Sequence, residues 1–346
     1  MKASLEHMLW HPVVALADLQ ATPVAVTLLG EPLVLWRDGE GQAHAWTDRC
    51  PHRGARLSLG QVVETDCGGR HLACPYHGWQ FAPGGQCVLV PARPDWTPPP
   101  GHAAGIHDAQ EAHGLLWVRL VAPDAGAPLP DELTRPPPFE PGSLPGWRSV
   151  VCGPYAVATS APRLVENFLD MSHFGFVHSG WLGDAAHAQV EAGHIEETAT
   201  GVRASNCRAW QPQGYAGADG GQFVAYDYAV LGPYAATLQK NSVAPDGPRN
   251  AIALFINPVH DEACTVWFVM STVNDPSTDE SLRAFQDAVF AQDRPVVESQ
   301  TPVRLPIHKG SSVDTDVPPE VHGPSDRLSA AYRRCLVRWG VTVGVC

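Results

Sequence analysis

The chain has 346 residues, which suits two domains, and 44% of them are hydrophobic, so it can bury a sizeable core. Its 23 Lys and Arg against 36 Asp and Glu give a net charge of −13 without any basic run, which argues against nucleic acid as a partner. No apolar run reaches the length of a membrane span and residues 1–20 lack the apolar core of a signal peptide, so we expect no membrane contact and a cytoplasmic location.

Residues 1–121 are predicted to form a small all-β domain. Short apolar segments alternate there with turn residues such as Asp38-Gly39 and Pro83-Gly84. The predicted strands are 24–28, 32–37, 44–47, 79–81, 86–90 and 114–121.

A proline-rich stretch, 122–147, follows this domain. It can form neither a continuous helix nor a central strand, so we expect a connection between domains. Residues 148–346 are then assigned to a second domain, with helices predicted at 163–178, 281–300 and 326–339 and strands at 223–231, 251–256 and 265–272. This order predicts an α+β fold in which one curved antiparallel sheet wraps around helices.

Two loops of the first domain each pair a cysteine with a histidine. The segment CPHRGARLSLG begins at Cys50, and CPYHGWQF begins at Cys74. Two Cys and two His form the ligand set of a Rieske [2Fe–2S] cluster, in which Cys holds one iron and His the other. A structural zinc site is the competing interpretation, but zinc motifs usually place like ligands together, whereas each loop here carries one of each. The predicted cluster ligands are Cys50, His52, Cys74 and His77.

The segment ENFLDMSHFGFVH of the second domain contains Asn167, Asp170, His173 and His178. Non-haem Fe(II) enzymes that activate O2 bind the metal through two His and one carboxylate on one face. The two His are five residues apart, roughly 140° on a regular helix, so convergence on one metal requires a widened turn or a helix end, with Gly175 as a candidate weak point. Two plain core histidines are the alternative. So many polar groups in an apolar helix are costly to bury without a purpose, which favours a metal.

The third ligand is predicted from the helix at 281–300. Apolar residues at 282, 285, 289 and 296 form a stripe at helical spacing, and Asp293 falls on it. Asp287 and Glu298 fall outside the stripe and are expected in solvent. A carboxylate on a buried face requires a cation nearby, so Asp293 is the predicted third ligand.

Together these motifs resemble the catalytic α subunit of the Rieske non-haem iron oxygenases, of the monooxygenase and demethylase type. The likeness covers nearly the whole chain and lies in the segments WHPV, CPYHGWQ, ENFLDMSHF, FAQDRPVVESQ and SDRLSAAYRRCLVRW. Methylxanthine N-demethylases look most similar, and dicamba O-demethylase and toluenesulfonate methyl-monooxygenase look more distant. The resemblance implies a Rieske domain followed by a helix-grip catalytic domain.

The resemblance also implies roles for single residues. The four loop residues match the cluster ligands, and His173, His178 and Asp293 match the ligands of the mononuclear iron. Asp170 matches the carboxylate that links a cluster histidine of one subunit to an iron-ligand histidine of its neighbour, and Asn167 matches a residue near the iron. The implied assembly is a head-to-tail homotrimer, or a heterohexamer with a homologous subunit.

The predicted function is that of a terminal oxygenase. It would hold a [2Fe–2S] cluster and Fe(II), use O2 as co-substrate, and take electrons from NAD(P)H through a separate reductase, with or without a ferredoxin. It would hydroxylate a small aromatic or heteroaromatic substrate, with N- or O-demethylation following. The alternatives are an aromatic ring-hydroxylating dioxygenase, a Rieske electron-transfer protein, and a scaffold subunit that has lost its iron; the second metal motif argues against the last two. No Lys or Arg stands out as a clamp for a carboxylate, which favours an uncharged substrate.

Overall fold

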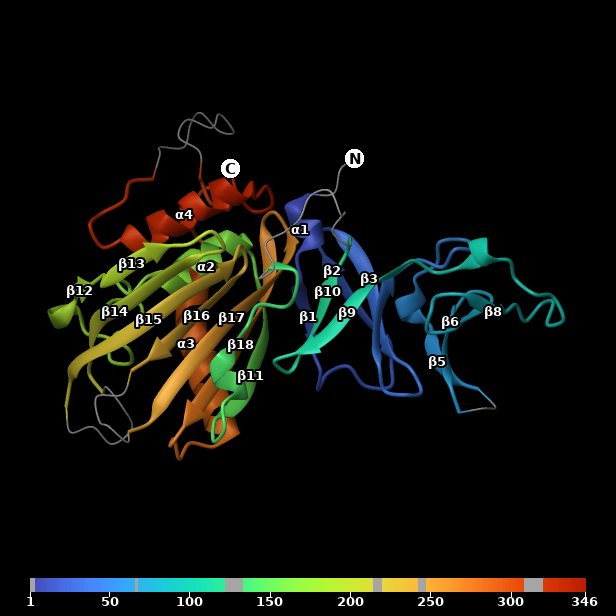
Figure 1. Cartoon of the computed structure of the whole chain (residues 1–346), viewed down its shortest axis with the longest axis horizontal. Coiled ribbons are helices and arrows are strands. Elements are labelled where there is room, and N and C mark those ends of the chain that lie inside the picture. Colours follow the sequence, from blue (N-terminus) through green and yellow to red (C-terminus); the bar gives the residue numbers. More distant parts are fainter. Residues whose placement is uncertain (1–3, 66–67, 122–132, 214–219, 242–246, 308–319) are drawn as a thin grey trace. The chain divides into compact units, whose positions relative to one another are not determined.

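The computed structural model describes residues 4–65, 68–121, 133–213, 220–241, 247–307 and 320–346, which fall into two compact units (Figure 1). The N-terminal unit comprises the described residues of 1–129 with Thr134–Pro136, and the C-terminal unit those of 130–133 with Pro137–Cys346. The boundaries at 121 and 148 stay a prediction, since residues 122–132 of the proposed connection lie outside the described residues.

The N-terminal unit consists of two antiparallel sheets and the short helix α1 (Leu5–Met8). The larger sheet has six strands in the order β1-β10-β9-β4-β3-β2. Its strands are β1 (His11–Ala15), β2 (Val24–Leu28), β3 (Glu31–Arg37), β4 (Ala43–Thr47), β9 (Ile106–Ala112) and β10 (Leu115–Arg119). The smaller sheet pairs β5 (Gln61–Glu64), β6 (Arg70–Ala73), β7 (Gln80–Phe81) and β8 (Cys87–Leu89) in sequence order. The predicted all-β class of this unit is confirmed.

One hydrophobic core joins the two sheets to the Cys-Pro loops. Trp36 and Trp46 of the larger sheet are buried in the same cluster as Leu72 and Phe81 of the smaller one. Cys50 and Cys74 are buried in this cluster as well. The core therefore fixes the base of both loops.

The C-terminal unit is built on one antiparallel sheet of eight strands, in the order β11-β18-β17-β16-β15-β14-β12 with β13 paired to β14. The strands are β11 (Arg148–Val157), β12 (Val190–Glu191), β13 (His194–Glu197), β14 (Val202–Gln211), β15 (Gln222–Gly232), β16 (Ala235–Lys240), β17 (Arg249–His260) and β18 (Ala263–Val273). Val224, Tyr226, Tyr228 and Val230 alternate with more exposed residues along β15 because successive side chains of a strand point to opposite faces. The sheet thus buries one continuous face.

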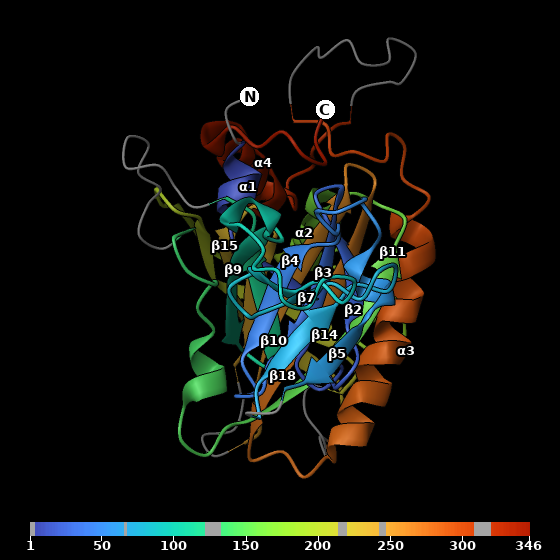
Figure 2. The same cartoon turned by 90° about the vertical axis from the view of Figure 1, so that its right-hand side faces the viewer.

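Three helices pack against this sheet (Figures 1 and 2). Helix α2 (Ala161–Leu169) contacts β16 and β17, and α3 (Asp279–Val297) runs along β11. Helix α4 (Arg327–Trp339) contacts β13, β14 and α2. The predicted antiparallel sheet around helices is confirmed. Within the described part of the chain, no helix is both long and apolar enough to cross a membrane.

The helix predicted at 163–178 is wrong beyond Leu169. Helix α2 begins after Ser160, whose hydroxyl accepts a hydrogen bond from the amide of Arg163 at 3.4 Å, and it ends at Asp170 in an extended conformation. The Asp170 carboxylate accepts a hydrogen bond from the amide of Ser172 at 2.7 Å. This local bond favours a turn where the helix would otherwise continue.

An ion pair ties α4 to α2. Arg333 of α4 donates to both carboxylate oxygens of Glu166 at 2.6 Å each, and these side chains are only 12% and 15% exposed. Arg333 also donates to the carbonyl of Pro306 at 2.9 Å and to Glu320 at 2.6 Å. Since Glu166 directly precedes Asn167, the C-terminal helix holds the helix that leads into the second metal motif.

We expect Arg333→Met to lower the free energy of unfolding of the C-terminal unit by about 3 kcal/mol or more, because it leaves the Glu166 carboxylate partly buried without its partner. Arg334→Met is the matched control: the neighbouring side chain is 59% exposed and pairs with Glu197, so its loss should cost less than about 1 kcal/mol. Urea unfolding of both variants measures the difference. If both variants lost the same free energy of unfolding, the Arg333–Glu166 pair would contribute no more to stability than an exposed ion pair, contrary to this prediction.

Candidate metal centres and substrate cavity

The two Cys-Pro loops share one backbone pattern. In the first, the amide of Cys50 donates to the carbonyl five residues on at 2.8 Å, and Gly54 donates to the Cys50 carbonyl at 2.9 Å. The second repeats this, with Cys74 donating five residues on at 2.8 Å and Gly78 to Cys74 at 3.1 Å. Gly54 and Gly78 have φ angles of 72° and 70°, which glycine adopts without steric cost. The two loops therefore share one backbone conformation, with Cys50 and Cys74 at equivalent positions.

The side chains of these loops separate into a buried sulfur pair and an exposed imidazole pair. Cys50 and Cys74 are buried and interact with each other. His52 and His77 are exposed, with ring centroids 4.6 Å apart, and Trp79 stacks on His52 at 4.4 Å. Thiolates on one side and imidazoles on the other form the donor set of a cluster in which Cys holds one iron and His the other.

A single zinc ion fits these four residues less well. A tetrahedral ion with bonds of about 2.0–2.3 Å would hold all four ligand atoms close together. Among the described residues, the group whose ligand atoms lie within 4.8 Å of one another is a different one, in the C-terminal unit. The separation into a sulfur pair and an imidazole pair suits a cluster of two irons, each with its own pair of ligands.

Two pKa shifts bear on metal binding at the loops. Partial desolvation by the neighbouring groups, and then the charge of His77, lower the pKa of the exposed His52, which favours the neutral imidazole that binds metals. Burial raises the pKa of Cys50 to about 11, so a bound metal would have to displace the thiol proton.

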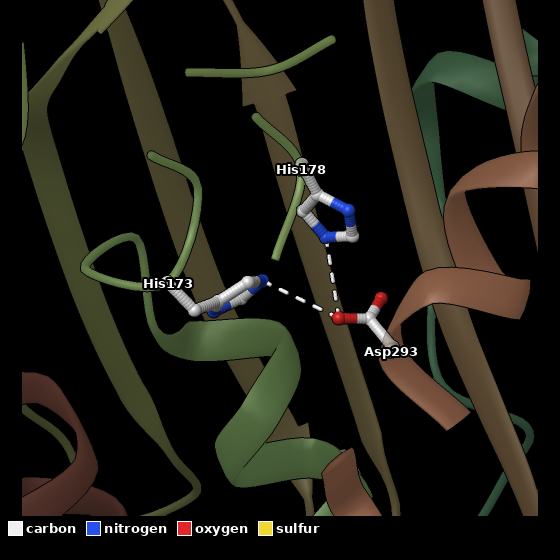
Figure 3. Close-up of side chains that lie close together, drawn as sticks. All are labelled: His173, His178 and Asp293. Carbon is white, nitrogen blue, oxygen red and sulfur yellow. Dashed lines mark ion pairs between the residues drawn. The ribbon is translucent and has the colours of Figure 1, made fainter. Parts of the chain in front are cut away.

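The second motif converges on Asp293 of α3. His173 Nε2 lies 3.5 Å and His178 Nε2 3.2 Å from Asp293 Oδ1, and Figure 3 shows both imidazoles turned toward the carboxylate. His178 and Asp293 are buried, and His173 is nearly so. Two imidazoles and one carboxylate gathered in this way are the donor set of a facial Fe(II) site.

Each histidine is oriented through its other ring nitrogen. His178 Nδ1 lies 2.8 Å from Gln292 Oε1, and His173 Nδ1 lies 3.2 Å from Asp170 Oδ2. With a metal bound, these acceptors would keep the proton on each Nδ1 and leave the lone pair of each Nε2 for the metal. The amide of Asn167 is 3.5 Å from Asp293 Oδ1, so it can orient the carboxylate. The sequence patterns do not single out Gln292; its position next to Asp293 is the only signal.

Asp170 is held as a carboxylate. Burial would raise its pKa, but the hydrogen bond and charge of His173 and the amide of Ser172 outweigh burial and hold the pKa of Asp170 below its usual value. Its side chain remains 33% exposed, so it contacts His173 on one side while staying accessible on the other.

Two expectations about local structure need correction. The helix ends before both histidines, so Gly175 is not the weak point of a helix. A Cβ at Gly175 would lie 2.9 Å from the carbonyl oxygen of Asp184, so glycine there permits a close backbone approach. On α3, residues 285 and 296 are exposed, and the buried stripe runs through Leu282, Gln286, Val289, Phe290, Asp293 and Val297. Asp293 lies on the buried face as predicted.

The triad opens into a cavity of about 440 Å³ in the C-terminal unit. Its walls are mostly apolar and aromatic, with side chains from α2, the segment after it, α3 and the sheet, including Phe168, Phe174, Leu238, Ile252, Phe268 and Val289. Besides the triad, the polar side chains of the lining are Asn167, Gln211, Gln213, Tyr226, Lys240, Asn250, Asp275, Ser277, Ser281 and Gln286. A cavity of this size and polarity is typical of a small-molecule site.

Comparison with known proteins places both halves of the chain. Residues 9–100 match the family model "Rieske [2Fe-2S] domain", and residues 157–341 match "Vanillate O-demethylase oxygenase C-terminal domain". Methylxanthine N1-demethylase NdmA of Pseudomonas putida is 32% identical over 94% of this chain and 87% of its own length. Methylxanthine N3-demethylase NdmB of the same organism is 31% identical over 96% of this chain and 89% of its own.

Solved structures agree with these matches. Pseudomonas putida NdmA with caffeine superimposes with a TM-score of 0.77 at 31% identity, covering 95% of this chain and 89% of that one. Dicamba monooxygenase, at 24% identity and a TM-score of 0.78, shares the fold over 97% of this chain and 98% of its own. The cluster loops, the second donor set and both family matches agree, and the chain belongs to the Rieske non-haem iron oxygenases, enzymes that carry a Rieske [2Fe–2S] cluster and a mononuclear iron.

Proposed function

We propose that this chain is the terminal oxygenase of a multicomponent system that hydroxylates an N- or O-methyl group of a small aromatic or heteroaromatic substrate, with demethylation following. The observation that carries the proposal is the His173, His178 and Asp293 group at the wall of a largely apolar cavity of about 440 Å³. An electron-transfer protein has no use for such a cavity. Demethylation is favoured over ring dihydroxylation because the relatives reported above are named demethylases.

The proposed reaction balances as a monooxygenation. One C–H bond of the methyl group breaks and a C–OH bond forms with one atom of O2. The other oxygen atom leaves as water, with two electrons and two protons supplied by NAD(P)H and H⁺. The hydroxymethyl group then breaks its bond to N or O, which releases formaldehyde and leaves an N–H or O–H on the substrate.

Each site residue has a proposed role. Cys50, His52, Cys74 and His77 would hold the cluster, and His173, His178 and Asp293 the mononuclear iron. When bound, the cluster would supply single electrons and the iron would supply O2 activation. Gln292 and Asp170 fix the orientation of the two imidazoles, Asn167 orients the Asp293 carboxylate, and the apolar walls keep water from the methyl group.

The proposed partners follow from the electron supply. An NAD(P)H-dependent reductase, directly or through a ferredoxin, would reduce the cluster in the cytoplasm. A match of 40% identity over 122 residues to "Oxidoreductase NdmD" of Pseudomonas putida, covering 35% of this chain and 20% of that protein, supports a shared redox module. We further propose a head-to-tail homotrimer, or a heterohexamer with a homologous subunit, in which Asp170 links His173 to a cluster histidine of the neighbouring subunit.

Asp293→Ala tests the iron site and the function together. We expect the protein to fall from about three irons per chain to about two, since the cluster keeps its own ligands. Formaldehyde release from methylated aromatic substrates, measured with a surrogate reductase, NADH and O2, should fall to background. The matched control is Asp287→Asn on the same helix, whose carboxylate is exposed and accepts a bond from Tyr155; it should keep three irons and its activity. Unchanged iron in Asp293→Ala would rule out the assigned ligand.

Asp170→Asn tests the proposed link between centres. We expect turnover to fall at least 100-fold while both metal centres stay bound, because the amide orients His173 less well and carries no charge. The readouts are iron content, the cluster's EPR signal, and the rate at which the reduced cluster is reoxidised with substrate and O2.

Asp184→Asn is the control for this variant. Asp184 also accepts a bond from the amide two residues on and pairs with a histidine three residues on, His187, but both side chains are exposed and lie outside the metal group. Its turnover should match the unmodified protein. Normal cluster reoxidation in Asp170→Asn would contradict the role of Asp170.

A further inference from the structure

The cavity contains a lysine that the sequence patterns do not single out. Lys240 is the last residue of β16, where it pairs with Tyr226 of β15 and with Asn250 of β17. All three side chains line the cavity that the metal triad also lines. Lys240 Nζ donates a hydrogen bond to Gln211 Oε1 at 2.7 Å.

The Lys240 ammonium has no acidic partner among the described residues. The two carboxylates that line the cavity are engaged elsewhere: Asp293 with the two histidines, and Asp275 with the amide of Ser277 at 2.8 Å. Burial lowers the pKa of Lys240 to about 8. Lys240 is only partly exposed, and a lysine that is partly withdrawn from water without a counter-charge destabilises the protein when the cavity is empty.

Gln211 holds the ammonium in place. Its side chain hydrogen-bonds Tyr226 as well as Lys240, which fixes the position of both polar groups. An ammonium has three N–H donors, and one of them is used by Gln211. Donors therefore remain for a ligand in the cavity.

The polarity of the cavity wall changes along the strands. Lys240 and Asn250 are opposite each other on β16 and β17. The next pair of opposite residues on the same face of the sheet (the next rung) is Leu238 and Ile252, and both line the cavity. Successive rungs on one face are about 7 Å apart, which is close to the length of a substituted benzene ring. An anionic group paired with Lys240 would thus bring an aromatic ring over the apolar rung.

On these grounds we propose that Lys240 is the anion-recognition residue of the cavity, and that the substrate is a small aromatic acid whose carboxylate pairs with Lys240 while its methyl group faces the His173, His178 and Asp293 group. This inference rests on the proposed function and names its substrate class. It replaces the expectation of an uncharged substrate, which followed from finding no cation among the sequence motifs.

The test compares two probes of the same shape and different charge, 3-methoxybenzoate and 3-methoxybenzamide, by isothermal titration calorimetry with the holoprotein. We expect the unmodified protein to bind the benzoate more tightly. Lys240→Met should weaken benzoate binding about 10- to 100-fold, the worth of a hydrogen bond to a charged group, and change benzamide binding less than about threefold. Lys240→Arg should retain the preference for the anion.

Two controls separate recognition from structure. Arg249→Met removes an exposed cation next to Asn250 that does not line the cavity, so it should leave both affinities unchanged. Lys240→Met should keep or raise the melting temperature, because it removes a half-buried charge that has no acidic partner within the described part of the chain. If Lys240 were needed for the fold, the melting temperature of this variant would fall.

The inference would be overturned if the unmodified protein bound the benzamide as tightly as the benzoate or more tightly, or did not bind the benzoate at millimolar concentration. It would also be overturned if Lys240→Met left the benzoate affinity unchanged. The proposed function fails separately. If no methoxyarene or N-methyl heteroaromatic releases formaldehyde with reductase and O2, demethylation is wrong even where the charge preference holds. If formaldehyde is released but the charge preference is absent, demethylation stands and the role of Lys240 is wrong.

Discussion

The buried carboxylate of Asp293 imposes the main constraint on the C-terminal unit. It lies on the inner face of α3 with His173 and His178 within 3.5 Å and the Asn167 amide at the same distance. Burying a charge of this kind costs several kcal/mol unless opposite charge and hydrogen bonds surround it. A divalent cation held by His173, His178 and Asp293 would supply that charge, and the surrounding residues orient these three side chains toward one another.

The course of the chain follows from this requirement. Helix α2 has to end before His173, because a continuous helix would point the two histidines in different directions. The helix ends at Asp170, whose carboxylate accepts a hydrogen bond from the amide of Ser172 and so favours a turn. The other oxygen of the same carboxylate contacts His173 Nδ1 and orients that imidazole. Gln292, which directly precedes Asp293 in α3, orients the imidazole of His178. Arg333 of α4 fixes the position of α2 by pairing with Glu166, one residue before Asn167.

Sites whose residues lie close together in the sequence can be predicted from it, whereas features that depend on which strands pair cannot. The two Cys-Pro loops and the two histidines are recognisable because their ligand types are unusual in apolar surroundings, and Asp293 is found because it interrupts a buried stripe. The helix over 163–178 was overextended because the pattern does not register the competing bond from Asp170 to Ser172. Strand β16, with the sequence AATLQK, is short and lacks clear alternation, so it is not predicted. Lys240 is therefore missed, since only the pairing of β16 with β15 and β17 brings it to the cavity.

In the function proposed for this Rieske oxygenase, the two centres have different tasks. The cysteines and histidines of the two matched loops would hold the electron-transferring cluster, and the two histidines and the carboxylate beside the apolar cavity would hold the iron that activates O2. The most direct test is a crystal structure of the purified holoprotein with anomalous data on both sides of the iron absorption edge. The account predicts one iron within about 2.0–2.2 Å of His173 Nε2, His178 Nε2 and an Asp293 oxygen, and a separate two-iron density between the sulfurs of Cys50 and Cys74 and the imidazoles of His52 and His77. A zinc signal between the loops, or iron absent from the His173, His178 and Asp293 group in active protein, would contradict it.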